Sequence, residues 1–338
     1  MKAALLHPQI PQDAPKDEQD VLIQVKAVGN ALEHLGFEPV PVSFSMDLAH
    51  VQQNLQDIDP AFVFNLVESV SGQGRLLYLA PALLDSMRLS YTGSPTEALF
   101  LSSNKVLAKS FLDFAQIPTP KSFTPDSLTG ALRQLHGRYI IKSVWEHASV
   151  GLDEDSVVDI HQPEDLLRQM NLRINKLGGE CFAEEFIQGR EFNLSLLEDG
   201  HGGVQVLPAA EICFENFAPG KPRIVDYDAK WNEESRAYRD TPRTFNIPES
   251  DLSLVRRLKI IALDCWRLFK LKGYARVDFR VDSQGLPWVL EINANPCISP
   301  DSGFIAAGSQ AGLDFDTVIK RIMENRVKHK PCNTETTL

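Results

Sequence analysis

The chain has 338 residues, 43% of them hydrophobic and 23% charged, which is typical of a globular protein with room for two or three domains. The formal net charge of −11 would repel a phosphate backbone and no block of Lys or Arg relieves it, so nucleic acid is disfavoured as a partner. No apolar run approaches the ~20 residues that span a bilayer, and no signal peptide is evident. We therefore expect a cytoplasmic protein with no membrane contact.

Strands and helices alternate in the first 95 residues, and this order predicts a small parallel sheet with covering helices. The expected strands are 2–6, 39–44 and 61–66, and the expected helices are 18–36 and 76–84. In the first helix apolar residues recur at spacings of three and four. Turn residues at 91–94 then mark a boundary, so residues 1–95 are expected to form an N-terminal α/β domain.

A second unit is expected over residues 96–187. A Ser or Asn at 102–104 favours the start of a helix that runs to about residue 115. Lys105 would lie in its first turn, an unfavourable place for a cation unless an anion also binds there. Lys142 ends a strand expected at 138–142, and the small polar segment 146–152 suits a loop that closes over phosphates. Ordinary solvated lysines are the alternative for both positions.

Two strands are expected between residues 180 and 197, with a turn at Gly189. Such a connection is a common way to hold an adenine ring by the backbone, here at Phe186 and Ile187, with a carboxylate on the ribose. Glu184 and Glu191 are the marked polar positions. Glutamates on the surface of a hairpin are the alternative interpretation.

Residues 188–330 are expected to form the third unit, and 331–338 a tail. A helix is predicted at 252–269 with Ser250 as its cap, followed by a hairpin at 273–293 and a last helix at 315–327. The chain after 327 is expected to fray.

The hairpin has one charged face and one apolar face. Alternation places Arg276 and Asp278 on one face of its first strand. In the second strand we expect Val289, Glu291 and Asn293 to share a face opposite Trp288, Leu290 and Ile292. If the strands pair, Asp278, Glu291 and Asn293 converge as a set of oxygen ligands suited to Mg²⁺. A solvated hairpin face is the alternative.

Arg-x-Asp-Phe at 276–279 and Glu-Ile-Asn-x-Asn-Pro at 291–296, with the upstream motifs in order, resemble the D-alanine–D-alanine ligase family of the ATP-grasp superfamily across nearly the whole chain. The resemblance implies an ATP-grasp fold of α/β (α+β overall) class with three domains. It also implies roles for single residues. The phosphate-binding positions are Lys105, Lys142, Glu146, Ser149 and Lys230; the adenine and ribose positions are Glu184, Phe186, Ile187 and Glu191; the metal ligands are Asp278, Glu291 and Asn293; the catalytic positions are Arg276, Lys230 and Ser302.

Departures from the family pattern cluster on the amino-acid side. His147-Ala148 replaces Gly-Ser in the phosphate loop, and Cys297 replaces the glycine after Asn-x-x-Pro. Segment 16–21 lacks the N-terminal serine and glutamate signature, although Glu18 or Asp20 could still hold an ammonium group. Segment 68–74 replaces the family's His-Gly and Gly-Glu-Asp-Gly sequence.

Five cysteines are widely spread, with no Cys-x-x-Cys pair, which argues against a disulfide framework or a zinc site. They are Cys181, Cys213, Cys265, Cys297 and Cys332. We expect most of them to be buried thiols.

The expected activity is ATP-dependent joining of a carboxylate to an amine through an acyl phosphate, with D-alanyl-D-alanine as one product to test. The cofactors implied are ATP and one or two Mg²⁺, with Mn²⁺ as a substitute, and the partners are amino-acid or peptide substrates and a second copy of the chain. Two alternatives stay open: a ligase for other amino acids or a natural-product intermediate, and a noncatalytic ATP-binding regulatory module.

Overall fold

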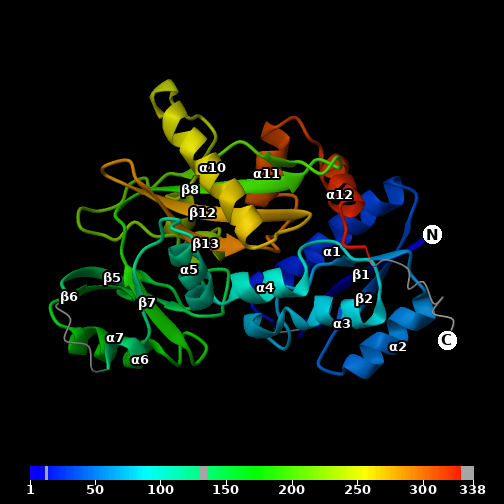
Figure 1. The fold of residues 1–338 in the computed structure, drawn as a ribbon, viewed down its shortest axis with the longest axis horizontal. Coiled ribbons are helices and arrows are strands. Elements are labelled where there is room, and N and C mark those ends of the chain that lie inside the picture. Colours follow the sequence, from blue (N-terminus) through cyan, green and yellow to red (C-terminus); the bar gives the residue numbers. More distant parts are fainter. Residues whose placement is uncertain (12–13, 130–134, 329–338) are drawn as a thin grey trace, which may run out of the picture.

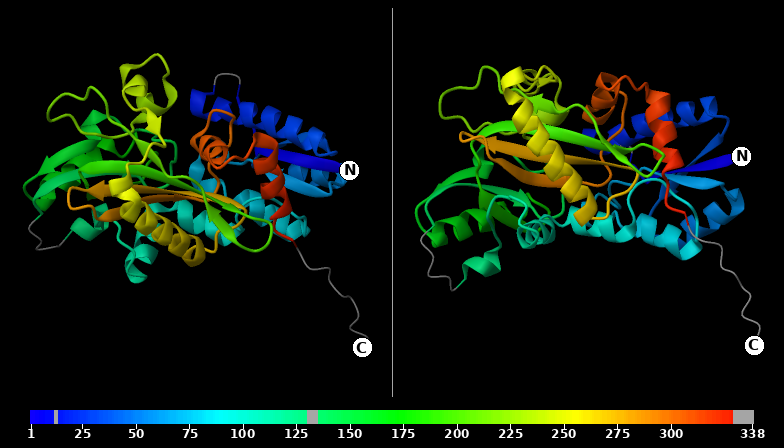
Figure 2. Two further views of the ribbon diagram at one scale, coloured as in Figure 1. Left: turned by 90° about the horizontal axis from the view of Figure 1, so that it is seen from above. Right: turned by 45° about the horizontal axis from the view of Figure 1, so that its top comes forward.

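The computed structural model describes residues 1–11, 14–129 and 135–328. Helices and strands both contribute throughout these ranges, as expected for an α/β protein (Figure 1). The predicted tail at 331–338 and Cys332 lie outside the described residues. Strands form three sheets, which Figure 2 shows from two further directions.

The N-terminal sheet is parallel, in the order β2-β1-β3. Its strands are β1 (Lys2–Pro8), β2 (Glu38–Phe44) and β3 (Phe62–Asn65). Its helices are α1 (Lys16–His34), α2 (Leu48–Ile58) and α3 (Leu79–Met87), and a 3₁₀ turn lies at Gly74–Leu76. The expected sheet and the helices α1 and α3 are thus confirmed, although α3 begins after the 3₁₀ turn rather than at residue 76, and α2 was not predicted.

The second sheet has four antiparallel strands in the order β4-β7-β5-β6. They are β4 (Ser122–Phe123), β5 (Gly137–Ser143), β6 (Val157–Ile160) and β7 (Cys181–Glu185). The helices of this region are α4 (Thr96–Ser103), α5 (Lys105–Phe114), α6 (Pro125–Leu128) and α7 (Pro163–Arg173). Asn104 caps α5 as predicted, because its side chain accepts a hydrogen bond from the Leu107 N–H. The sequence prediction missed α4, α6 and α7 and the strands β4 and β6.

The third sheet is antiparallel and has β8 and β12 at its centre. Its strands are β8 (Gly189–Glu198), β9 (Val204–Val206), β10 (Ala210–Ile212), β11 (Arg243–Thr244), β12 (Tyr274–Asp282) and β13 (Pro287–Asn293). The helices are α8 (Tyr227–Trp231), α9 (Arg236–Arg239), α10 (Leu252–Leu268), α11 (Gly303–Gln310) and α12 (Phe315–Glu324). Figure 1 shows α10 lying across this sheet, and its buried residues Leu258 and Cys265 share a core with Val277.

Two end predictions for these helices are wrong. A short 3₁₀ turn at Glu249–Asp251 precedes α10, whose cap position is Asp251 with no side-chain capping bond, so Ser250 does not cap it. The last helix ends at Glu324, and Val327 instead pairs with Tyr91 as an isolated bridge.

The C-terminal helices pack on the N-terminal unit. One buried cluster joins Leu5 of β1 and Val28 of α1 to Phe304 of α11 and Ile319 of α12. The shared core holds the third sheet against α1. The limits placed at residues 95 and 187 stay a prediction.

Gly189 lies where β8 passes β12 without room for a side chain. An added Cβ would clash with the carbonyl oxygen of Val281 and lie 2.9 Å from its carbon. Because these are backbone atoms of a paired strand, they cannot move away cheaply. We expect Gly189→Ala to lower the free energy of unfolding in urea by about 1–3 kcal/mol.

Gly29→Ala is the matched control. Gly29 lies in α1, and a Cβ there would meet the Leu5 side chain at an ordinary 3.5 Å. This variant should be neutral or stabilised by about 0.5–1 kcal/mol, because alanine favours a helix. Equal urea midpoints for Gly189→Ala and the wild type would contradict the packing argument.

Candidate active site

A cavity of about 960 Å³ opens between the second and third sheets, and we call it the ATP-side cavity. All the site residues predicted from the sequence line it. They are Lys105, Lys142, Glu146, Ser149, Glu184, Phe186, Ile187, Glu191, Lys230, Arg276, Asp278, Glu291, Asn293 and Ser302. The fold therefore brings together residues that are spread over almost two hundred positions of the sequence.

Lys105 opens α5 but does not leave its charge at the helix N-terminus. Its Nζ donates a hydrogen bond to the carbonyl oxygen of Glu146 at 2.7 Å and lies 3.8 Å from Glu291 Oε1. Burial lowers the pKa of Lys105, and the Glu291 carboxylate opposes that shift. The side chain thus reaches from the helix to the phosphate-loop segment and to the hairpin.

Glu184 is buried between two lysines. Its carboxylate oxygens lie 2.5 Å from Lys109 Nζ and 2.6 Å from Lys142 Nζ. Burial alone would raise the pKa of Glu184, but the two cations outweigh it and hold the pKa below its ordinary value. The sequence prediction missed Lys109. Its spacing of four from Lys105, which puts both on one face of α5, was the available signal.

Glu191 of β8 faces β12 across the third sheet. Its Oε2 lies 3.0 Å from Arg280 Nη2, and the guanidinium also packs over the rings of Phe186 and Phe214. Burial raises the pKa of Glu191, and Arg280 opposes the shift. The pair fixes the carboxylate beside the β7–β8 connection, where Phe186 and Ile187 line the cavity.

The hairpin pairs as predicted, with Asp278 opposite Glu291 and Arg276 opposite Asn293. Arg276 grips Asp278 through two bonds, of 2.7 and 2.8 Å, and Asn193 Nδ2 donates to Asp278 Oδ1 at 2.8 Å. Two carboxylates and an amide oxygen on neighbouring strands at one cavity wall fit a hard cation such as Mg²⁺. Within the described residues no three His, Cys, Asp or Glu side chains lie together as a metal site. The hairpin set differs because it has two carboxylates, and its third ligand is the amide oxygen of Asn293.

The predicted faces of β13 are wrong in part. The register shifts after Asp278, so that Phe279 lies opposite Val289 and Leu290 has no partner, which is a β-bulge. The extra residue resets the alternation. Val289 therefore joins Ile292 in the apolar core, while Leu290 lines the ATP-side cavity with Glu291.

Segment 146–152 is anchored on both sides. The Gly74 N–H donates to Glu146 Oε2 at 3.3 Å, and Ser149 Oγ donates to the carbonyl oxygen of Val225 at 2.8 Å. Trp231 Nε1 donates to the carbonyl oxygen of Ala148 at 3.0 Å. Ala148 and Ser149 both have positive φ, at 60° and 62°, a conformation that costs free energy for residues other than glycine. These bonds compensate for the strain and hold the loop over the cavity.

His147 is mostly buried and bound. Its Nδ1 lies 2.8 Å from Glu291 Oε1, and since a carboxylate only accepts, Nδ1 carries the proton. Burial and the nearby Lys105 lower the pKa of His147. The histidine therefore positions Glu291.

Ser302 and Lys230 differ in their contacts with the rest of the protein. Ser302 Oγ accepts a hydrogen bond from the Ile305 N–H at 3.3 Å and so caps α11. Lys230 Nζ lies over the Trp231 ring, 5.7 Å from its centroid, and no ion pair or hydrogen bond forms at this ammonium within the described residues. Burial and then Arg276 lower the pKa of Lys230.

A second charged group lies at the N-terminal end of the ATP-side cavity. Gln24 Nε2 donates to Glu68 Oε1 at 2.9 Å and to Asp20 Oδ2 at 3.1 Å, and Gln24 Oε1 accepts from the Ile298 N–H. One amide thus joins α1, the loop after β3 and the loop after β13. Burial, reinforced by Asp20, raises the pKa of Glu68 to about 7. Glu68 lines the ATP-side cavity, and the sequence showed it only as part of a departure from the family pattern.

Cys297 belongs to the same group of residues. Its Sγ donates to Asp20 Oδ2 at 3.0 Å and lies 3.1 Å from Ser299 Oγ. Burial and the carboxylates of Glu68 and Asp20 raise the pKa of the thiol well above its ordinary value. A protonated thiol is a poor nucleophile, so Cys297 acts as a hydrogen-bond donor. Cys181 and Cys265 are buried, while Cys213 and Cys297 are half-buried.

The comparisons agree with this geometry. The family model described as D-ala D-ala ligase C-terminus matches residues 124–324. An uncharacterised protein of Sinorhizobium fredii, y4sG, is 29% identical over 94% of this chain and 90% of its own length. The D-alanine–D-alanine ligase of Pelotomaculum thermopropionicum is 27% identical over 91% and 92%.

A solved D-alanine–D-alanine ligase from Bacillus anthracis, complexed with ATP, covers 96% of both chains with a TM-score of 0.68 and 18% identity. This likeness confirms the expected ATP-grasp fold. No helix in the described ranges is long and apolar enough to cross a membrane. Because the family model spans more than half of the sequence and the motifs converge in one cavity, the chain belongs to the D-alanine–D-alanine ligase family of ATP-dependent ligases.

Proposed function

We propose that the chain joins an amino-acid or peptide carboxylate to an amine. The carboxylate oxygen attacks the γ-phosphorus of ATP and ADP leaves; the amine nitrogen then attacks the acyl carbon, and phosphate leaves with the bonding electrons. The main support is the convergence of Lys105, Lys142 and Lys230 with Arg276 at one cavity, because phosphoryl transfer depends on positioning and charge neutralisation. D-alanyl-D-alanine is one product to test.

The second sheet and the β7–β8 connection would hold the nucleotide. In this proposal Lys105 and Lys142 bind phosphates, with Glu146 and Ser149 closing the loop over them. The backbone of Phe186 and Ile187 contacts the adenine edge beside Glu184, and Glu191 contacts the ribose. The pairing of Glu184 with two lysines ties the adenine end of the cavity to its phosphate end.

The hairpin would hold one or two Mg²⁺ ions, with Mn²⁺ as a substitute, through Asp278, Glu291 and Asn293. Bound there, the metal supplies positive charge that screens the phosphate oxygens. A positive side chain of the protein already lies beside each carboxylate. Arg276 pairs with Asp278, and Lys105 lies near Glu291. The metal and these two cations would therefore together supply the positive charge that balances the carboxylates and the phosphates.

Arg276 and Lys230 would neutralise charge on the transferred phosphoryl group. Lys230 suits this role because its ammonium has no competing carboxylate contact among the described residues. Ser302 would act through its cap on α11, which places the start of that helix beside the amino-acid substrate. We place Asp20 and Glu68 at the substrate ammonium group. We also propose a cytoplasmic location and a homodimer, on the family resemblance alone.

Turnover with amino acids tests the function directly. With Mg-ATP and pairs drawn from a panel of D- and L-amino acids, at least one pair should release ADP and phosphate together with a new amide product detected by mass spectrometry. Tight binding of Mg-ATP without phosphate release for any pair would favour a noncatalytic ATP-binding module instead.

Asp278→Asn and Glu291→Gln test the metal set. Each removes a negative ligand while keeping the side-chain shape, so we expect kcat to fall by about 10²-fold or more and the far-ultraviolet circular dichroism to stay the same. Asp264→Asn in α10 is the control, because its half-exposed carboxylate pairs with Arg267 at the surface and lies outside the ATP-side cavity. Wild-type turnover in both hairpin variants would refute the placement.

Glu68 predicts a pH dependence. With a pKa of about 7 the carboxyl is neutral below that pH and ionised above it, and only the ionised form attracts an ammonium group. The value of kcat/KM for the amino acid should rise about tenfold over two pH units centred on this pKa. The neighbouring groups that also act on Glu68 are Asp20, Lys230 and Arg276.

Glu68→Gln should remove that inflection while keeping an acceptor for Gln24. Glu33→Gln on the exposed face of α1 serves as the matched control and should keep the wild-type profile. A profile of unchanged shape in Glu68→Gln would show that another group controls the pH dependence.

A further inference from the structure

A second cavity of about 810 Å³ adjoins the ATP-side cavity, and we call it the N-terminal cavity. The loop after β1, the start of α1 and segment 68–75 line one part of it, and segments 145–153 and 226–231 line the other. The two cavities meet at a shared wall that includes Glu68, His147, Val150 and Trp231. The phosphate-loop segment thus has a cavity on each side.

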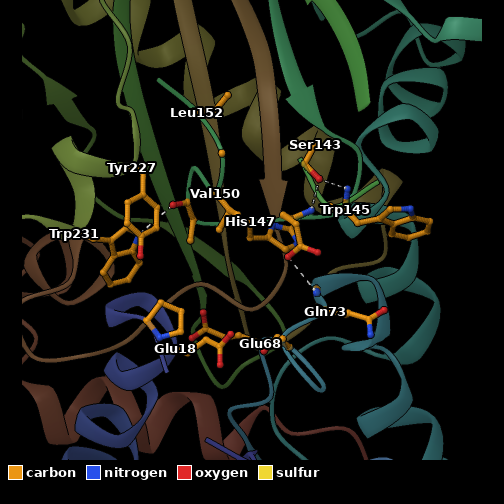
Figure 3. Close-up of a pocket in the computed structure, with 18 of the residues that line it drawn as sticks. Glu18, Glu68, Gln73, Ser143, Trp145, His147, Val150, Leu152, Tyr227 and Trp231 are labelled. Carbon is orange, nitrogen blue, oxygen red and sulfur yellow. Dashed lines mark hydrogen bonds between the residues drawn. The ribbon is translucent and has the colours of Figure 1, made fainter. Parts of the chain in front are cut away.

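Aromatic and apolar side chains form much of the N-terminal cavity. Figure 3 shows Tyr227 and Trp231 on one side, Trp145 on the other, and His147 and Val150 between them. Trp145 is fixed by a bond from its Nε1 to Glu180 Oε2 at 3.0 Å. Pocket walls of this kind bind ligands with extended apolar parts.

Charge in the N-terminal cavity is mostly negative. The lining carboxylates are Glu18, Glu68, Glu146, Asp153, Asp226 and Asp228, whereas the lining cations are Arg75 and Lys176. Arg75 pairs with Glu180 at 3.3 Å, and Asp153 is itself neutralised by Lys176 and Arg173, so the excess of negative charge comes from the other lining carboxylates. An anionic side chain would therefore meet repulsion there, while an uncharged or cationic one would not.

The volume of the cavity exceeds what alanine needs. Cavities of roughly 300–1,000 Å³ bury drug-sized ligands, and the side chain of alanine is a single methyl group. Glu68 lines both cavities, so it marks where a substrate would pass from one to the other. If the ammonium group of a substrate lies at Glu68, the carboxylate of that substrate would point toward Arg276 and the substrate side chain toward the N-terminal cavity.

We propose that the N-terminal cavity receives the side chain of an amino-acid or short-peptide substrate that is larger than alanine and is uncharged or cationic. The inference rests on the proposed ligase function and names the substrate class of the same site. Three observations support it. The two cavities meet at Glu68, aromatic side chains form part of the walls, and carboxylates outnumber cations in the lining.

A substrate panel tests the inference. Alanine, phenylalanine, lysine and glutamate, each as the D and the L form, are supplied with Mg-ATP, alone and paired with D-alanine, and phosphate release is measured. We expect kcat/KM for phenylalanine or lysine to exceed that for alanine at least tenfold, with glutamate the poorest. Highest efficiency with alanine, or glutamate equal to lysine, would overturn the inference and leave the ligase function intact. If no phosphate is released with any of these amino acids or with a wider panel, both the inference and the ligase function are overturned.

Ser69→Phe tests the location. Ser69 lines only the N-terminal cavity, so the added ring should raise KM for the preferred large substrate at least tenfold relative to alanine, with KM for ATP unchanged. Ser86→Phe, on the exposed face of α3, should behave as wild type. Equal KM values in Ser69→Phe and Ser86→Phe would contradict the assignment.

A change of charge provides a second variant should Ser69→Phe fold poorly. Asp228 lines the N-terminal cavity and is exposed. Asp228→Lys should lower kcat/KM for lysine relative to phenylalanine about tenfold, because it places a cation where the substrate cation lies. Asp126→Lys in α6, at the surface, should leave that ratio unchanged, and an unchanged ratio in Asp228→Lys would exclude a cationic side chain from the cavity.

Discussion

Buried carboxylates and cations are paired around the ATP-side cavity, and several of these pairs join elements that are distant in sequence. Glu184 of β7 pairs with Lys109 of α5 and Lys142 of β5, and Glu291 of β13 lies near Lys105 of α5 and accepts a hydrogen bond from His147 of the phosphate-loop segment. Removal of one partner would leave an uncompensated charge in a poorly solvated place, at a cost of several kcal/mol. The pairs therefore fix where the sheets and the loop lie, and the rest of the site follows from that placement.

In the proposed function, catalysis and substrate choice depend on different parts of the molecule. The hairpin of β12 and β13 provides Asp278 and Glu291 from a rigid, paired sheet, where the Leu290 bulge turns one more side chain toward the cavity. Gln24, by contrast, joins helix α1 to the loop after β3 and the loop after β13, which meet only in the folded chain. One fold can serve several substrates when the reacting groups lie on strands and the substrate-contacting groups lie on loops.

The sequence predicted the hairpin well because alternation and turn residues are local signals. The register of the two hairpin strands could not be predicted in this way. A bulge shifts every later side chain, and its position depends on how the partner strand packs. Val289 shows this: by alternation it belongs with Glu291, yet it is buried in the core opposite Phe279. Lys109 was missed for a similar reason, because its partner Glu184 lies on another element.

By itself the sequence determined many of the strands and helices, the family, and a set of polar side chains that line the ATP-side cavity, because these depend on local periodicity and on motifs in a fixed order. Only the tertiary structure decided which charges pair, that Cys297 keeps its proton beside Asp20, and that a second cavity adjoins Glu68. These properties arise from burial and from contacts between distant segments, which no window of the sequence contains.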